Sequence, residues 1–165
     1  SLKHKNKNHI DEKEYLDLAR YYLYKELPQK AIKVINDGFD KDIVERSKEN
    51  YELMADSYFF LRERDVGIEY LIKSLELEKD SNIAFKIGRF AFEEEDWFLA
   101  IKYLKEASDL NYNKVPGRLD LLIGISYYEV NKINEAEKYF NNALNYEATK
   151  TPAEGWLAFI KELNT

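Results

Sequence analysis

The sequence predicts an all-α fold: a right-handed superhelix, or α-solenoid, of four helix hairpins that ends in a capping helix. Apolar residues recur at helical spacing from Asp11 onward, and no stretch alternates at period two for long enough to indicate a strand. One pattern of small and large residues occurs four times along the chain. With 165 residues, 45% of them hydrophobic, the chain suits one compact domain or one short repeat array.

Small residues at a fixed spacing define the four repeats. Each repeat has one small reference residue: Ala31, Gly67, Ala100 and Ala136. Twelve positions earlier lies a second small residue: Ala19, Ala55, Gly88 and Gly124. Four positions after the reference residue lies a large apolar one: Ile35, Leu71, Leu104 and Phe140. Two antiparallel helices approach closely where side chains are small, so we expect the two small sets to face each other across each hairpin. One such hairpin cannot bury its apolar face alone and must stack on a neighbour.

Helical periodicity sets the expected elements in chain order. In the first hairpin, apolar residues fall at Leu16, Ala19 and Leu23 and then at Ile32 and Ile35. The later hairpins follow from the repeated pattern, because each repeat places one small residue on either helix. The expected helices span 12–26, 29–39, 47–62, 65–78, 82–94, 97–109, 117–130, 134–147 and 152–163.

The predicted core consists of the repeated positions and one tryptophan. Its members are Ala19, Tyr22, Ala31, Ile35, Ala55, Tyr58, Leu71, Gly88, Ala100, Leu104, Gly124, Tyr127, Ala136, Phe140 and Trp156. A larger side chain at a close helix crossing would overpack it. We therefore expect Gly88→Leu or Gly124→Leu to cost about 1–3 kcal/mol.

The N-terminal end differs from the repeats. Residues 1–10 are polar and basic and lack periodicity, so we expect a disordered linker there, ahead of four hairpins over 11–150. The chain begins with Ser1, and its single methionine is Met54. We therefore expect a fragment of a longer protein, from which any targeting segment is missing.

The C-terminal end has the pattern of one more helix. Thr151 and Glu154 have the spacing of a capping box, and Pro152 occupies a favoured first helical position. We expect a capping helix within 151–165, with Trp156 as a packing plug on the last hairpin.

Composition excludes several classes of function. The chain has no cysteine, which excludes disulfides, thiolate nucleophiles and cysteine-based metal sites. Residues 11–165 carry 22 basic and 31 acidic residues, a poor balance for binding a nucleic acid. No apolar run is long enough for a membrane span, and no phosphate loop, HExxH motif or nucleophile elbow occurs. His4 and His9 lack a third ligand, and the acidic run 93–96 fits a solvated turn. We expect no catalytic residue, metal, cofactor or small-molecule substrate.

The repeats, spaced by 36, 33 and 36 residues, resemble the tetratricopeptide repeat (TPR), a helix hairpin of about 34 residues. The resemblance implies that the first helix of each hairpin lines a concave groove that binds a protein segment. The positions expected to line this groove are Leu16, Arg20, Tyr24, Asp56, Phe59, Phe85, Arg89, Phe92, Leu121, Ile125 and Tyr128.

The expected groove combines aromatic and charged residues. The aromatic members would supply contact area: Phe59, Phe85, Phe92 and Tyr128. The charged members would set the orientation of the partner: Arg20, Asp56 and Arg89. Two alternatives remain open, since the charged residues could form an ion ladder between neighbouring hairpins and the aromatic residues could pack between repeats.

Several segments also resemble a particular group of TPR proteins, those that accompany bacterial TonB–ExbB–ExbD energy-transduction systems. The segments are 26–39, 49–63, 87–107, 115–143 and 156–159. This resemblance implies a non-catalytic periplasmic protein that helps to couple inner-membrane proton motive force to outer-membrane uptake. The alternatives are a cytoplasmic location, and a role as helper domain of a larger enzyme or of another secretion or assembly complex.

Overall fold

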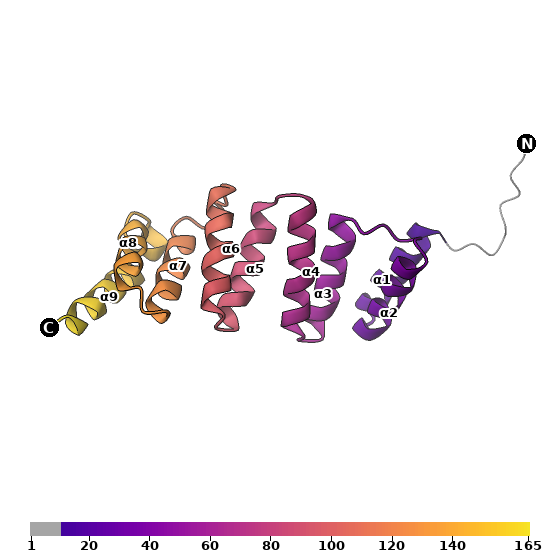
Figure 1. The fold of residues 1–165 in the computed structure, drawn as a ribbon, viewed down its shortest axis with the longest axis horizontal. Coiled ribbons are helices and arrows are strands. Elements are labelled where there is room, and N and C mark those ends of the chain that lie inside the picture. The colour runs from indigo at the N-terminus through magenta and orange to yellow at the C-terminus, as the bar shows by residue number, and fades with distance from the viewer. Residues whose placement is uncertain (1–10) are drawn as a thin grey trace, which may run out of the picture. The chain divides into compact units, whose positions relative to one another are not determined.

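The structure is a computed structural model, and it describes residues 11–165. Within this range the backbone forms nine α-helices and no strand, which confirms the predicted all-α class. The expected linker over 1–10 lies outside the described residues. In chain order the helices are α1 (Glu12–Tyr24), α2 (Pro28–Asp40), α3 (Lys48–Phe60), α4 (Arg64–Leu77), α5 (Ser81–Glu93), α6 (Trp97–Asp109), α7 (Arg118–Glu129), α8 (Ile133–Ala143) and α9 (Glu147–Leu163) (Figure 1).

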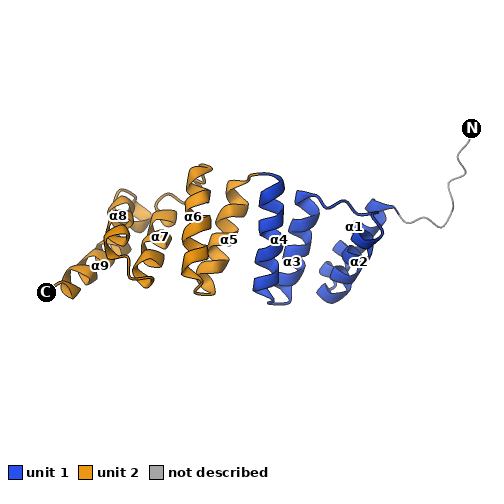
Figure 2. Cartoon of the chain, viewed as in Figure 1, with its two compact units in different colours: residues 1–78 blue, residues 79–165 orange. Residues whose placement is uncertain are grey.

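The chain divides into two compact units, and the boundary lies between Glu78 and Lys79 (Figure 2). The first unit contains the hairpins α1–α2 and α3–α4, and α3 packs on α2. The second unit contains the hairpins α5–α6 and α7–α8, with α7 packed on α6. Helix α9 packs on both α7 and α8 and completes the second unit.

The turn inside each hairpin repeats the same backbone conformation. Four non-glycine residues at equivalent positions have positive φ angles of 58–62°: Glu26, Arg62, Glu95 and Asn131. In each turn the next residue donates its backbone N–H to a carbonyl five positions back, as Leu27 does to Tyr22 at 2.8 Å. This bond satisfies a carbonyl that the end of the first helix would otherwise leave open, and it reverses the chain in a few residues.

The close contact in the third and fourth hairpins joins a glycine to a large residue. A Cβ added at Gly88 would lie 2.6 Å from Cγ of Leu104, and one added at Gly124 would lie 2.7 Å from Cε1 of Phe140. Both large residues are completely buried. Each glycine therefore leaves a space that the large residue of the opposite helix fills.

The second small position of the repeat works in the same way. A Cβ added at Gly67 on α4 would lie 2.6 Å from Cε1 of Phe59 on α3. At these three glycines the expectation that two small residues face each other is therefore wrong. Each glycine instead faces a large side chain, which fills the space between the helices.

Most of the predicted core is confirmed by burial. The fully buried members are Ala19, Ala31, Ile35, Ala55, Leu71, Gly88, Ala100, Leu104, Gly124, Ala136 and Phe140. The half-buried members are Tyr22, Tyr58, Tyr127 and Trp156. The tyrosines lie at the edge of the core because a phenol group packs its ring inside and keeps its hydroxyl within reach of water.

The last helix begins earlier than predicted. Helix α9 begins at Glu147, so the capping box expected at Thr151 is wrong. Thr149 is buried, and its hydroxyl donates a hydrogen bond of 2.8 Å to the carbonyl of Ala143. That bond joins the first turn of α9 to the end of α8. Pro152 consequently lies inside the helix, where it removes one backbone donor.

Two alanine substitutions test the packing of a small residue against a large one. Gly124→Ala places a methyl group against the buried ring of Phe140, so we expect a loss of about 1–3 kcal/mol in unfolding free energy. Gly155→Ala on α9 meets nothing within 4 Å, so we expect a gain of about 0.5–1 kcal/mol from helix propensity. Urea denaturation followed by circular dichroism measures both, and equal effects at the two glycines would contradict the packing described here.

Candidate protein-binding surface

The predicted aromatic residue Phe85 lies in the interior of the second unit. Its side chain is 8% exposed, and its ring stacks on Tyr112 with 4.2 Å between centroids. The guanidinium of Arg118 lies 5.5 Å from the Phe85 ring. Tyr112 belongs to the loop between α6 and α7, so Phe85 fastens this loop to α5. Phe85 therefore fits the alternative in which the aromatic residues pack between repeats.

Two further predicted aromatic residues also pack within their own hairpins. The half-buried ring of Phe59 covers Gly67, as described above. The ring of Phe92 meets Trp97 edge to face, with 5.3 Å between centroids. Both contacts join the end of the first helix of a hairpin to the start of its second helix. Each ring therefore packs within its own hairpin.

The predicted charged residues form ion pairs along their own helices. Arg20 lies 3.8 Å from Asp17, one turn earlier on α1. Arg89 lies 2.8 Å from Glu93, one turn later on α5. Asp56 lies exposed on α3.

Other predicted groove residues pack against neighbouring helices. Leu16 lies partly buried against the core of the first unit. Leu121 and Ile125 pack against the apolar cluster that joins α8 to α9. Tyr24 is 80% exposed. Phe60 occupies the same repeat position 36 residues later and is 52% exposed.

A shallow aromatic surface lies at the C-terminal end of the second unit. Pro152, Gly155, Trp156 and Phe159 line a depression of about 350 Å³, which we call the α9 depression. Trp156 stacks on the buried ring of Phe140, with 5.3 Å between centroids and 8° between planes. One face of the indole is therefore fixed in the core. Gly155 has no side chain that could fill the floor, and nothing lies within 4 Å of its Cβ position.

The predicted residue Tyr128 belongs to the edge of this depression. Its ring lies 5.2 Å from Trp156 and 5.8 Å from Phe159, between centroids. The sequence predicted Tyr128 as a groove residue and Trp156 as a packing plug, and it predicted no binding role for Pro152, Gly155 or Phe159. The missing signal was their helical spacing, which places them on one exposed face of α9 once the helix is seen to begin at Glu147.

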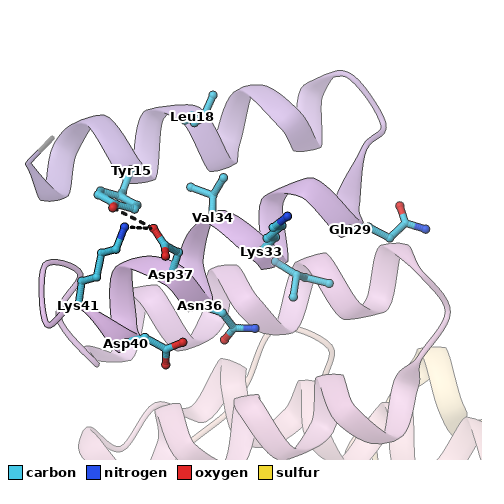
Figure 3. A pocket seen from close by; sticks show the side chains of 10 residues that line it. Tyr15, Leu18, Gln29, Lys33, Val34, Asn36, Asp37, Asp40 and Lys41 are labelled. Carbon is cyan, nitrogen blue, oxygen red and sulfur yellow. Dashed lines mark hydrogen bonds and ion pairs between the residues drawn. The ribbon is translucent and has the colours of Figure 1, made fainter.

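A larger groove lies on the first hairpin, and none of its lining residues was predicted to line the binding groove. It has a volume of about 820 Å³ and lies between α1 and α2; we call it the α1–α2 groove (Figure 3). Its lining residues are Tyr15, Leu18, Gln29, Ile32, Lys33, Val34, Asn36, Asp37, Asp40 and Lys41. The apolar lining residues could contact an apolar side chain of another molecule. We call the four charged lining residues the rim of the groove: Lys33, Asp37, Asp40 and Lys41.

A short polar network fixes one end of the α1–α2 groove. Lys41 donates a hydrogen bond of 2.9 Å to Asp37, and the hydroxyl of Tyr15 donates one of 3.0 Å to the same carboxylate (Figure 3). These two bonds, first that of Lys41 and then that of Tyr15, hold the pKa of Asp37 below its usual value. Asp37 is therefore ionised at neutral pH, and the rim keeps a fixed charge.

A cluster of titratable side chains joins α6 to the fourth hairpin, and its pKa shifts fit a structural contact. Lys105 donates a 3.4 Å hydrogen bond to the hydroxyl of Tyr127, and this bond raises the pKa of the lysine. Burial raises the pKa of Tyr139, which stacks on Tyr127, and burial also raises the pKa of Asp120. A nucleophilic lysine needs the opposite shift. Among the described residues, no three acidic or histidine side chains form a metal-binding group.

Comparisons with known proteins show the fold of the chain. No protein-family model and no curated protein matches it. Solved structures of MamA, an all-helical protein of the TPR type, do match. One crystal structure of MamA is 24% identical with a TM-score of 0.62, over 85% of this chain and 80% of that one. MamA of AMB-1 is 18% identical with a TM-score of 0.68, over 90% and 80%. MamA from Desulfovibrio magneticus RS-1, residues 41 to the end, is 14% identical with a TM-score of 0.64, over 92% and 94%.

The chain therefore has a TPR fold. Together with the hairpins described above, these matches confirm the TPR resemblance inferred from the repeat spacing. At these identities they show the fold alone, and they add no support to the more particular resemblance to TonB-system proteins. No described helix is both long enough and apolar enough to cross a membrane.

A pair of aromatic substitutions separates packing residues from surface residues. Phe85→Ala removes a buried ring that holds Tyr112, so we expect a loss of about 3–5 kcal/mol in stability. Phe60→Ala removes a half-exposed ring, so we expect a cost below about 1.5 kcal/mol. Thermal and urea unfolding compare the two, and a Phe85→Ala protein as stable as the parent would contradict the assigned packing.

Asp120→Asn tests the cost of burying a carboxylate. Because burial raises the folded-state pKa of Asp120, folding favours its protonated form. This contribution is complete below the unfolded-state pKa and is lost as pH rises through the folded-state value. We expect Asp120→Asn to be more stable than the parent near pH 7, and the difference to disappear by about pH 3. Unfolding curves across this range measure it, and a difference that grows toward low pH would be the contrary result.

Proposed function

We propose that this chain is a non-catalytic TPR scaffold that binds a segment of another protein. The observation that carries the proposal is the α9 depression, where exposed aromatic and small residues leave an apolar surface open on the last helix. Aromatic side chains bury a large area with few rotatable bonds, and they dominate the energetics of protein interfaces. A TPR fold supplies the rigid helices on which such a surface is held.

The α9 depression is preorganised for binding. Trp156 is stacked on Phe140, and Tyr128 and Phe159 lie against the indole, so four aromatic side chains hold one another in place. A partner that binds here loses its own conformational freedom but does not have to order the aromatic side chains. The size of the depression suits one apolar side chain of the partner, such as Leu, Met or Phe.

The formal charge of the chain, −6, favours a basic or neutral partner. Long-range attraction raises the association rate of oppositely charged molecules and weakens as salt increases. The partner segment that we propose therefore combines one apolar anchor with flanking Lys or Arg residues.

A narrower proposal concerns the identity of the partner. The sequence resemblance to TPR proteins of TonB–ExbB–ExbD systems supports a component of such a system as partner, and with it a periplasmic location. Its test is direct titration of the purified chain with the soluble domains of TonB and ExbD. We expect saturable binding to at least one of them, weakened by Phe159→Ala. Absence of binding to both would overturn this narrower proposal and leave the scaffold function standing.

Two substitutions at one position test the scaffold function. Gly155→Trp fills the α9 depression, whereas Gly155→Ala adds one methyl group in open space. Peptides selected on the parent chain from a displayed library should bind the Gly155→Ala variant unchanged. Their affinity for the Gly155→Trp variant should fall at least about tenfold, the loss typical of an obstructed interface centre.

Helical content by circular dichroism serves as the folding control for both variants. Phe159→Ala provides a second, subtractive change at the same surface. Selection of no peptide at all, or peptides that bind the parent and the Gly155→Trp variant equally, would contradict the α9 depression as the binding site.

A further inference from the structure

An exposed stripe runs along the outer face of α1. Glu14, Leu18 and Tyr21 of α1 and Lys25, the residue that caps its C-terminal end, lie four, three and four residues apart, so they share one face. Leu18 is 41% exposed and Tyr21 is 52% exposed. We call these four residues the α1 stripe. Two apolar residues form its centre, an acidic residue lies at one end and a basic residue at the other.

The same repeat positions are buried in later hairpins. In the second hairpin the equivalents of Glu14, Leu18 and Tyr21 are all buried: Asn50, Met54 and Ser57. In the fourth hairpin they are buried too: Leu119, Ile123 and Ser126. In each case the helix carrying them packs on the second helix of the hairpin before it, α3 on α2 and α7 on α6. The α1 stripe is therefore the position of a helix contact that α2 and α6 provide elsewhere.

The α1–α2 groove beside the stripe also indicates a position where another helix would pack. Tyr51 is the equivalent of Tyr15, and Phe39 of the preceding helix lies against it with 5.9 Å between ring centroids. Beside Tyr15 the α1–α2 groove opens instead, with a volume of about 820 Å³. An aromatic side chain from another helix would occupy this groove as Phe39 occupies its equivalent.

We propose that the α1 stripe binds a second copy of this chain, with the two α1 helices antiparallel about a two-fold axis. Glu14 and Lys25 are equally distant from the midpoint between positions 19 and 20, and so are Leu18 and Tyr21. A two-fold axis through this midpoint brings Glu14 of each copy opposite Lys25 of the other. It also sets Leu18 against Tyr21 twice. The charged ends lie about 16 Å apart along each helix, at 1.5 Å per residue.

The charges around the α1–α2 groove agree with a self-complementary contact. The rim carries two lysines and two aspartates: Lys33, Lys41, Asp37 and Asp40. A rim with both signs in equal number can pair with its own copy, because an isologous interface opposes each residue to a different one. A strongly acidic or basic partner would leave half of these charges opposed to like charges.

Charge reversal at both ends of the stripe tests the pairing. We expect the parent chain to be a dimer in sedimentation equilibrium at micromolar concentration. Glu14→Lys alone, or Lys25→Glu alone, opposes like charges at both ends of the axis, so each single variant should dimerise about tenfold more weakly. The double variant restores opposite charges, and its dimer affinity should return to within about threefold of the parent.

The double variant also controls for local effects on the helix. Glu14 accepts the backbone N–H of Asp11 at 3.1 Å in a capping box, which Glu14→Lys removes. Because the double variant lacks this box as well, its recovery reports on the pairing and not on the helix end. Leu18→Glu should abolish the dimer, whereas Leu163→Glu on α9, another exposed leucine, should leave it intact.

Two results would overturn the proposal. One is a monomeric parent chain across the tested concentrations, which would assign the α1 stripe to a different protein or to a preceding segment of a longer chain. The other is a dimer that the single charge reversals leave unchanged, or one that the double variant fails to restore.

Discussion

Three of the four hairpins depend on one kind of contact, in which a glycine on one helix leaves room for a large side chain of the other. The three contacts are Gly67 against Phe59, Gly88 against Leu104 and Gly124 against Phe140. This contact fixes the rotation of both helices, and so it determines which residues of the first helix face the neighbouring hairpin and which face solvent. A methyl group at the glycine forces the large residue to move, and the stack of helices adjusts with it.

The sequence was sufficient to predict the fold class and the hairpins, because small residues and helical spacing are local signals. It was not sufficient to identify the exposed face. Neighbouring residues on a helix point about 100° apart, so an error of one position exchanges a packed side chain for an exposed one. Phe59 was expected on the surface, yet its ring covers Gly67, while the adjacent Phe60 is half exposed. The start of α9 was missed because the bond from Thr149 to Ala143 depends on how two helices meet.

The surfaces proposed for binding follow from the same repeat positions. Inside each unit, a first helix buries one face on the preceding hairpin, as Met54 and Ile123 do. Where no preceding hairpin is described, at α1, the equivalent face is exposed around Leu18. On α9, which packs on α7 and α8, an aromatic depression stays open around Gly155. The repeat pattern thus accounts for both the stability of the hairpins and the places where another molecule can bind.

Cysteine labelling tests this account most directly, since the chain contains no cysteine of its own. Single cysteines at positions 18, 54 and 123 occupy one repeat position in three hairpins, and their reaction rates with a thiol reagent compare their exposure. The account predicts fast labelling at position 18 in dilute protein, slower labelling when the protein is concentrated, and rates on the order of 100-fold lower at positions 54 and 123 at every concentration. Similar rates at all three positions would contradict it.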